Sequence, residues 1–171
     1  PEFWNGDIPF FTPKDVGSPY TSQTEKMITP TGLEHCNSRL YPKNTSFVTA
    51  RGTVGKVSLA GKPMAMNQSC YALASDNIDL ILVYFYTLRA VDSLKHKASG
   101  AVFDAIVTRD FETEVVSVIP ETESKAILSL IAPMMEAIHT NSEENIRLAA
   151  LRDALLPRLM SGEIDVSSIT L

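Results

Sequence analysis

Residues 46–60 read SFVTARGTVGKVSLA, two runs of β-forming residues separated by a glycine-bracketed break. The first run is rich in β-branched and aromatic side chains, and the second, from Val57, alternates apolar with small polar ones. Gly52 and Gly55 bracket a turn or bulge between the runs. The pattern predicts two strands, and residues 64–73 predict a further strand after them.

The segment before this stretch holds six prolines in 45 residues and is typical of extended pieces and turns. Asn5-Gly6-Asp7 predicts a tight turn that leads into the apolar run of residues 8–11. Trp4, Phe10 and Phe11 are expected in the core rather than as exposed stacking groups.

A helix is predicted after the strands, with Asp76 as its N-cap and Gly100 at its C-terminal stop. Its apolar side chains fall mainly on one helical face: Ile78, Ile81, Leu82, Phe85, Leu88 and Leu94. Residues 102–107 and 114–119 follow as short strand candidates, and Pro120 closes the second of them.

Residues 122–160 contain no glycine and are rich in Leu, Ile, Met, Ala and Glu. Apolar side chains approximate a seven-residue repeat at Ile127, Ile131, Met134, Ile138, Leu148, Leu155 and Leu159. Asn141 and Asn145 occupy the two seam positions between these groups. Pro133 and Pro157 are expected to kink or interrupt the helix unless each lies at a first turn. Since such a helix cannot bury its own stripe, the stripe is predicted to be an interface with a partner helix.

The chain has 171 residues, of which 44% are hydrophobic and 20% charged, as in an ordinary globular domain with an appendage. This composition excludes a largely disordered chain. No apolar stretch approaches the roughly 20 residues that span a bilayer, and no signal peptide is expected. The expected location is cytoplasmic. There Cys36 and Cys70 are interpreted as free thiols, with a disulfide between them as the alternative.

The formal net charge of −5 disfavours nucleic acid as a partner, but the charge is unevenly distributed. Residues 1–120 carry eleven Lys or Arg and twelve Asp or Glu, a net of −1, whereas residues 121–171 carry four and eight, a net of −4. No carboxylate lies between Glu34 and Asp76, where five cations occur: Arg39, Lys43, Arg51, Lys56 and Lys62. This segment suits contact with phosphates, and the alternative is a solvated sheet face balanced by acids from elsewhere.

The sequence contains no clear catalytic or cofactor motif. There is no Gly-x-Gly-x-x-Gly, and Gly52-Thr53-Val54-Gly55-Lys56 is too short for a phosphate-binding loop and lacks the following hydroxyl residue. The three histidines are isolated from other metal-ligating residues. Four acids could be imagined as a nuclease cluster but are more simply surface carboxylates: Asp104, Asp110, Glu112 and Glu114. We therefore predict a binding module with no catalytic residues, no metal and no cofactor.

Five segments, taken in order, form a recognisable set. They read FWNGDIPF with TPKDV within residues 3–16, TARGTVGKV at 49–57, MNQSC at 66–70, ASGAVFD at 98–104 and LRDALLPRLMSGEI at 151–164. This set resembles the specificity subunit of type I restriction–modification enzymes, and the matches span nearly the whole chain.

The chain also departs from that family. It lacks the strand and Gly-Thr-Pro-Ser-like loop that precede the Trp-Asn-Gly-Asp segment, and the Glu-Gln step at the start of the long helix. Full subunits carry two recognition domains and two spacer helices. The chain therefore resembles the C-terminal half of a subunit, or a half-size subunit that works as a dimer.

The pattern and the resemblance together predict an α+β fold. Residues 1–120 are expected to form a target recognition domain, a mixed twisted β-sheet with a few helices. Residues 121–171 are expected to form a long spacer helix for an antiparallel coiled coil.

The resemblance implies a non-catalytic subunit that reads one half of a bipartite double-stranded DNA target. Its expected partners are modification subunits, which transfer a methyl group from S-adenosylmethionine to adenine, and restriction subunits, which add ATP-driven translocation and cleavage. The spacer helix is expected to pair with a second recognition half or with another copy, and no membrane is involved. The alternative is a helix-mediated protein-interaction scaffold without a nucleic-acid role.

The residues expected to contact DNA are Lys14, Arg39, Lys43, Thr49, Arg51, Thr53, Lys56, Lys62, Asn67, Gln68, Ser99 and Arg109. Arg51 and Lys56 flank the glycine pair, where the backbone can approach DNA closely. Asn67 and Gln68 carry amides suited to adenine, and amides that brace a loop fit the sequence equally well.

Overall fold

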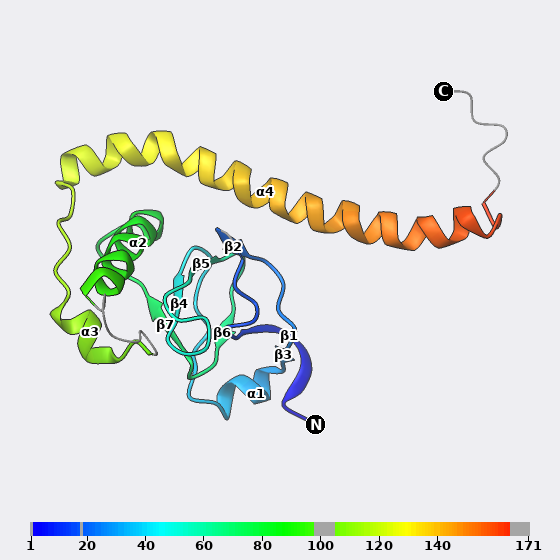
Figure 1. The fold of residues 1–171 in the computed structure, drawn as a ribbon, viewed down its shortest axis with the longest axis horizontal. Helices are drawn as coiled ribbons and strands as arrows, with labels where there is room; N and C mark the ends of the chain where they lie inside the picture. The colour runs from blue at the N-terminus through cyan, green and yellow to red at the C-terminus, as the bar shows by residue number, and fades with distance from the viewer. Residues whose placement is uncertain (1, 18, 98–104, 165–171) are drawn as a thin grey trace. The chain divides into compact units, whose positions relative to one another are not determined.

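The computed structural model describes residues 2–17, 19–97 and 105–164. The chain divides into two compact units, residues 1–135 and residues 136–171, and each is described by itself. The strands, all in the first unit as far as the described residues go (Figure 1), are β1 (Trp4–Phe11), β2 (Tyr20–Thr21), β3 (Met27–Ile28), β4 (Ser46–Thr49), β5 (Val57–Ala60), β6 (Ala65–Met66) and β7 (Cys70–Leu73). The helices are α1 (Pro30–Glu34), α2 (Leu80–Lys97), α3 (Thr108–Thr113) and α4 (Glu121–Met160).

The strands form two sheets, both with mixed strand directions, so the predicted α+β class is confirmed. The four-stranded sheet has the order β2-β5-β4-β7, in which only the β2–β5 pair is parallel. The three-stranded sheet has the order β3-β1-β6, with β1 antiparallel to β3 and parallel to β6.

Strands β4 and β5 are the two strands predicted from residues 46–60, and they pair antiparallel. Strand β4 is buried along its whole length. Phe47 belongs to an apolar cluster with Phe11 of β1, and the centroids of the two rings lie 4.8 Å apart. The neighbouring Val48 belongs to a different cluster, with Val91 and Leu94 of α2. Because successive strand residues point to opposite faces, the four-stranded sheet is covered on both faces.

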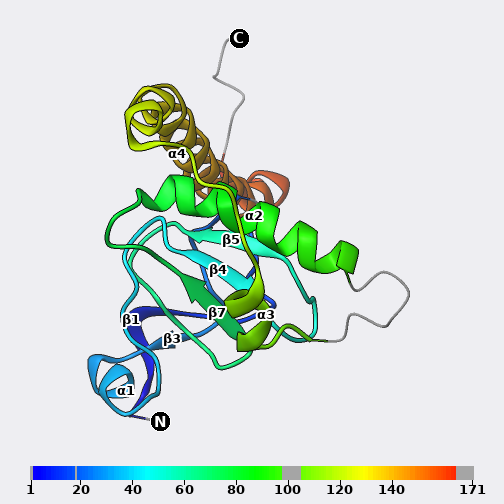
Figure 2. The same cartoon turned by 90° about the vertical axis from the view of Figure 1, so that its left-hand side faces the viewer.

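Helix α2 lies across one face of this sheet, as Figure 2 shows. The prediction that Asp76 caps the helix is wrong. The helix begins at Leu80, and the carboxylate of Asp79 accepts the backbone N–H of Ile81 at 2.8 Å, which satisfies one of the free donors at the helix start.

The buried face of α2 is broader than the sequence indicates. Phe85 and Leu88, predicted in the core, are exposed, while Tyr84 is buried. Tyr84 belongs to a third apolar cluster, with Leu59 of β5 and Met135 of α4. Helix α2 is covered on one side by the sheet and on another by the beginning of α4. It therefore buries more of its surface than a single apolar stripe.

The Asn5-Gly6-Asp7 step lies inside β1, so the prediction of a turn before the strand is wrong. The pairing of β1 with β3 shifts register between Trp4 and Ile8, and Asn5 has a φ of 64°. A Cβ on Gly6 would lie 2.5 Å from the carbonyl oxygen of Ile28, so two backbones come too close here for a side chain. The step forms a bulge that lets β1 bend without ending.

Residues 64–73 form two strands instead of the one predicted. Strand β6 pairs with β1 in one sheet, and β7 pairs with β4 in the other. The turn of Asn67 to Ser69 carries the chain from one sheet to the other. The division depends on pairing with β1 and β4, which are distant in the sequence, so the local residue pattern cannot predict it.

Neither predicted strand near residue 110 is present in the described residues. The segment from 105 to 107 leads into α3, and residues 114–119 are irregular; residues 102–104, like Gly100, lie outside the described part. The backbone N–H of Ile106 donates to the carbonyl of Ala50, and that of Ile119 donates to the Tyr86 hydroxyl at 2.9 Å. Each of these two N–H groups forms a single hydrogen bond with a different element, so the segments do not form the repeated hydrogen bonds of a β-sheet.

Helix α4 is continuous through both of its prolines, so the expected interruptions do not occur. Near Pro133, Met135 belongs to the third apolar cluster and Ala132 packs against it, and this packing offsets the lost backbone hydrogen bond. Pro157 lies in the last turn, where few helical hydrogen bonds remain to be lost. The helix begins at Glu121, next to the predicted domain boundary, whereas the first compact unit extends to Met135. No described helix is long and apolar enough to cross a membrane.

Replacing Phe47 with Ala is expected to lower the free energy of unfolding by about 3–5 kcal/mol, because a fully buried ring in contact with Phe11 and Tyr41 is removed. Urea denaturation followed by circular dichroism measures the change. The matched control is Phe85→Ala on the exposed side of α2, with an expected loss below about 1 kcal/mol. Equal losses in the two variants would contradict the packing described above.

Candidate nucleic-acid interface

Four loops of the first unit surround an open depression of about 430 Å³. They are the loop after β1, the β2–β3 loop, the β4–β5 loop and the β6–β7 turn. The described lining residues are Thr12, Pro13, Lys14, Glu25, Lys26, Arg51, Gly52, Asn67 and Ser69. Three residues predicted from the sequence to bind DNA, Lys14, Arg51 and Asn67, are thus brought together from distant parts of the chain.

The loop after β1 is held in place by Asp15. One carboxylate oxygen of Asp15 accepts the backbone N–H and the hydroxyl of Thr12, at 2.8 and 2.6 Å. The other oxygen accepts the backbone N–H of Glu25 at 2.7 Å. These charge-assisted hydrogen bonds fix Lys14 and the segment of Glu25 and Lys26 on neighbouring parts of the rim.

The β4–β5 loop is braced by Thr49, which is fully buried at the end of β4. The Thr49 hydroxyl donates to the carbonyl of Thr53 and accepts the backbone N–H of Lys56 at 3.0 Å. Gly52 and Gly55 have φ values of 79° and 71°, the left-handed region that glycine tolerates best. The predicted DNA contact by Thr49 is therefore replaced by a structural role, and the loop that it braces carries the exposed Arg51.

The β6–β7 turn is tied down on both of its sides. The backbone N–H of Asn67 donates to the carbonyl of Phe11 at 2.9 Å, and the side-chain oxygen of Asn67 accepts the N–H of Ser69 at 3.0 Å. The carbonyl of Ser69 accepts the N–H of Ala50 at 2.8 Å. Gln68 lies at the tip of this turn and is exposed.

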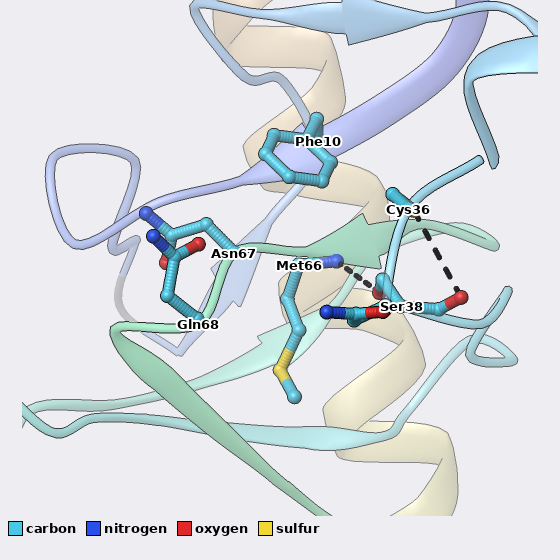
Figure 3. A pocket seen from close by; sticks show the side chains of 7 residues that line it. Phe10, Cys36, Ser38, Met66, Asn67 and Gln68 are labelled. Atoms are coloured by element: carbon cyan, nitrogen blue, oxygen red, sulfur yellow. Dashed lines mark hydrogen bonds between the residues drawn. The ribbon is translucent and has the colours of Figure 1, made fainter.

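A second cavity, of about 450 Å³, lies on the other side of the same turn (Figure 3). Phe10, Met66, Asn67 and Gln68 line it together with residues 36–38. In Figure 3 the Asn67 and Gln68 side chains lie next to each other, and the Met66 side chain extends away from Phe10. Asn67 lines both cavities, so the turn forms the wall between them.

Positive charge dominates the first depression. Lys14, Lys26 and Arg51 face a single carboxylate among the described lining residues, that of Glu25. The Lys14 ammonium lies 3.9 Å from the Glu25 carboxylate, and because both side chains are exposed this ion pair is weak. The Lys26 ammonium lies 5.4 Å from the centre of the Trp4 ring. Trp4 is 42% exposed, so its predicted core position is wrong, and Lys26 covers one face of its ring.

The remaining residues predicted to bind DNA are not among the described residues that line the depression: Arg39, Lys43, Thr49, Thr53, Lys56, Lys62, Gln68 and Arg109. Thr53 is adjacent to it, since its hydroxyl donates to the carbonyl of Pro13 at 3.4 Å. The Arg39 guanidinium instead lies 5.0 Å from the centre of the Tyr41 ring. Ser99 lies outside the described residues.

The sequence does not identify Lys26, which lines the depression, or Asp15, which holds the loop after β1, as candidates. Lys26 lies outside the carboxylate-free segment and next to Glu25, and only the pairing of β1 with β3 brings it to the rim. The spacing of Thr12 and Asp15 is a signal that could have been used, because an aspartate commonly satisfies nearby backbone groups in turns.

Two acids of the imagined nuclease cluster, Asp110 and Glu114, have ordinary structural roles, and Asp104 lies outside the described residues. The carboxylate of Asp110 accepts the backbone N–H of Val107 at the start of α3, at 2.7 Å. Glu114 is paired with Lys97 at 2.5 Å, and hydrogen bonds from Lys97 and Ser93 lower the pKa of Glu114. Among residues 2–17, 19–97 and 105–164, no three His, Cys, Asp or Glu side chains form a possible metal site.

Both cysteines are free thiols, as the sequence indicated. Burial, and to a smaller extent the negative charge of Asp15, raises the pKa of the Cys70 thiol to about 12. Cys70 therefore stays protonated at neutral pH and acts as a small apolar residue of the core.

The predicted seam of α4 is used unequally. Ile131 packs on the third apolar cluster of the first unit. Met134 is 63% exposed, and Ile138, Leu148 and Leu159 are exposed as well. Nothing described covers these four side chains, and their role as an interface stays a prediction.

The comparisons with known proteins agree with this fold. The family model described as the type I restriction modification DNA specificity domain matches residues 2–148. The chain belongs to this family.

Several relatives of this specificity domain are similar in sequence or in structure. The MjaIX specificity subunit of Methanocaldococcus jannaschii is 28% identical over 151 residues, which are 84% of this chain and 35% of that protein. The HindI specificity subunit of Haemophilus influenzae is 30% identical over 172 residues, which are 95% of this chain and 37% of that protein. The HsdS subunit of Thermoanaerobacter tengcongensis has a similar fold, with a TM-score of 0.54 at 17% identity, and the match covers 95% of this chain and 40% of that one. The chain thus spans little more than a third of the length of these two curated relatives.

Replacing Thr49 with Val is expected to lower the free energy of unfolding of the specificity domain by about 1–3 kcal/mol, because the Thr53 carbonyl and the Lys56 N–H lose the buried Thr49 hydroxyl as their partner. Amide hydrogen exchange at Lys56 is expected to become faster in the same variant. Thr49→Ser keeps the hydroxyl and is the matched control. If the Val variant protects the Lys56 amide as well as the wild type does, the hydroxyl is not what holds the loop.

Proposed function

We propose that this chain is a DNA-binding specificity half-subunit of a type I restriction–modification complex, and that it reads one half of a bipartite target. The observation that carries the proposal is the convergence of Lys14, Lys26 and Arg51 on one depression beside an amide-bearing turn. Cations fix a protein on the phosphate backbone, while amides and other polar groups read base edges. The family of the chain supports the same assignment.

The overall acidity does not oppose this proposal. Of the net charge of −5, residues 121–171 contribute −4, because they have eight acidic and four basic residues. The segment between Glu34 and Asp76 has no acidic residue. The acids nearest the depression are engaged, since Asp15 accepts three hydrogen bonds and Glu25 lies near Lys14. A DNA strand would therefore meet a local excess of positive charge.

The chain itself is proposed to be a non-catalytic recognition subunit. Modification subunits would dock on it and carry out methyl transfer, and restriction subunits would join them in the full complex. Residues 1–120 would form the recognition domain, and residues 121–171 the spacer that sets the distance to the second half-site.

The exposed side of α4 is proposed to pair with an antiparallel copy of itself. Asn141 and Asn145 are exposed seam positions, and Ile138 and Leu148 lie outside them. In an antiparallel pair centred on residue 143, Asn141 faces Asn145 of the other copy, and Ile138 faces Leu148. Buried asparagines that meet one another specify a register, since other registers leave an amide against an apolar side chain.

Charge reversal at the depression tests the DNA-binding proposal. Lys14→Glu combined with Arg51→Glu is expected to weaken binding of the full chain to mixed-sequence duplex DNA by roughly tenfold or more at low salt. The slope of log affinity against log salt is expected to fall by about 1.8, about 0.9 for each phosphate that is no longer neutralised. Fluorescence anisotropy at several salt concentrations measures both, with Arg89→Glu, an exposed cation of α2, as control. An unchanged slope in the double variant, or wild-type affinity independent of salt, would favour the protein-interaction scaffold instead.

Charge placed in the seam tests the pairing proposal. The double variant Ile138→Glu, Leu148→Glu is expected to sediment with half the mass of the wild-type chain, because four buried carboxylates would have to be desolvated in the pair. Ile146→Glu changes a residue on a different side of the same helix and is expected to keep the wild-type mass. A monomeric wild-type chain, or an unchanged mass for the double variant, would refute self-pairing through this seam.

A further inference from the structure

We infer that Gln68 is a specificity-determining residue that reads an adenine of an A·T pair in the major groove, and that Asn67 positions it. The inference rests on the proposed function, since it names the base that this turn would recognise. The two neighbouring amides look equivalent in the sequence but differ in the structure. The Asn67 side chain is hydrogen-bonded within the turn, whereas Gln68 is exposed.

Asn67 is occupied by the turn itself. Its side-chain oxygen accepts the N–H of Ser69, and its backbone N–H and C=O bond to Phe11 and Cys70 at 2.9 and 3.2 Å. An amide that closes a turn in this way is restricted in how it can turn toward a ligand. Asn67 therefore holds the backbone of Gln68 in a fixed position. A fixed position lowers the conformational entropy that Gln68 loses on binding.

Gln68 has the opposite character. It is exposed at the tip of the turn, and within the described part of the chain its carboxamide has no hydrogen-bond partner. The β6–β7 turn that carries it is fixed to β1 on one side and to the end of β4 on the other, through Phe11 and Ala50. A free carboxamide on a rigid turn can donate to one group and accept from another at the same time.

Adenine is the base that matches this group. In the major groove it presents the N7 acceptor and the N6 amino donor side by side, and a glutamine amide pairs with both. The apolar part of the same cavity suits the partner base. Phe10 and Met66 line the space beside Gln68, and the thymine methyl group is the apolar feature of an A·T pair in that groove.

The phosphate-binding side of the turn supports this orientation. Ser69 and Asn67 line the depression of Lys14, Lys26 and Arg51, whereas Gln68 lines the cavity on the other side. A strand held by its phosphates in the depression would present the edges of its bases across the turn. Backbone contacts of this kind set the register in which a base is read.

Selection from a randomised duplex library, with the full chain bound to its modification subunits, tests the inference. The wild type is expected to select a half-site with a strong adenine at one position or more. Gln68→Ala is expected to lose the preference at one such position and to keep the others, with affinity for the wild-type site reduced by roughly 5- to 150-fold. Gln68→Glu is expected to exchange that adenine for cytosine, whose amino group donates to a carboxylate.

Gln23→Ala is the matched control, because Gln23 is an exposed glutamine in a loop and lines neither cavity. Its selected half-site is expected to equal that of the wild type. If Gln68→Ala also selects the wild-type half-site, Gln68 does not read a base, and the proposed function is untouched. If the wild type selects no half-site at all, the proposed function fails.

Base analogues in the selected site identify the atoms that are read. 7-Deazaadenine removes the N7 acceptor and is expected to weaken binding of the wild type, but to cause no further loss in Gln68→Ala. Uracil in place of the opposite thymine removes the methyl group and is expected to weaken the wild type more than Met66→Ala. Equal losses from 7-deazaadenine in the wild type and in Gln68→Ala would overturn the assignment.

The positioning role of Asn67 has its own readout. Asn67→Ala is expected to speed hydrogen exchange at the Ser69 amide in the free protein and to weaken adenine selection at the same position. Asn67→Ser retains a short oxygen acceptor and is expected to restore part of both. Loss of selection without faster exchange would make Asn67 a direct contact and not a positioning residue.

Discussion

Strand β4 is buried on both of its faces, and the arrangement of the first unit depends on this burial. Phe47 packs on Phe11 of β1 on one face, and Val48 packs on α2 on the other. These two contacts place the smaller sheet and the helix on opposite sides of the larger sheet. They also fix the end of β4, from which Thr49 braces the loop that carries Arg51.

The candidate interface is formed by the loops at the ends of the strands that this core positions. The loop after β1, the β4–β5 loop and the β6–β7 turn are held by hydrogen bonds of backbone groups and of short, half-buried side chains such as Asp15 and Asn67. Their cations and Gln68 are left exposed. Rigid loops with free polar ends suit recognition, because little side-chain or backbone order must be gained when a partner binds.

Helix α4 shows how one amphipathic pattern can serve two surfaces. Its first turns pack Leu128, Ile131 and Met135 on the core of the first unit. Farther along the helix, apolar residues of the same repeat are exposed, among them Ile138 and Leu148. The first part of the repeat therefore packs on the core, and its later part is left free for another partner.

Local patterns in the sequence were sufficient to predict the β4–β5 pair, the α2 and α4 helices and the α+β class, because these depend on periodicity and on glycine and proline positions. Short motifs also located Lys14, Arg51 and Asn67. Four features emerged from the folded chain alone: residues 64–73 divide between two sheets, Lys26 joins the depression, Thr49 is a brace, and Asn67 is hydrogen-bonded within its turn while Gln68 is exposed. The physical reason is common to all four. Each depends on hydrogen bonds or packing between segments far apart in the chain, such as Asn67 with Phe11, and no local pattern encodes which distant backbone group will be near.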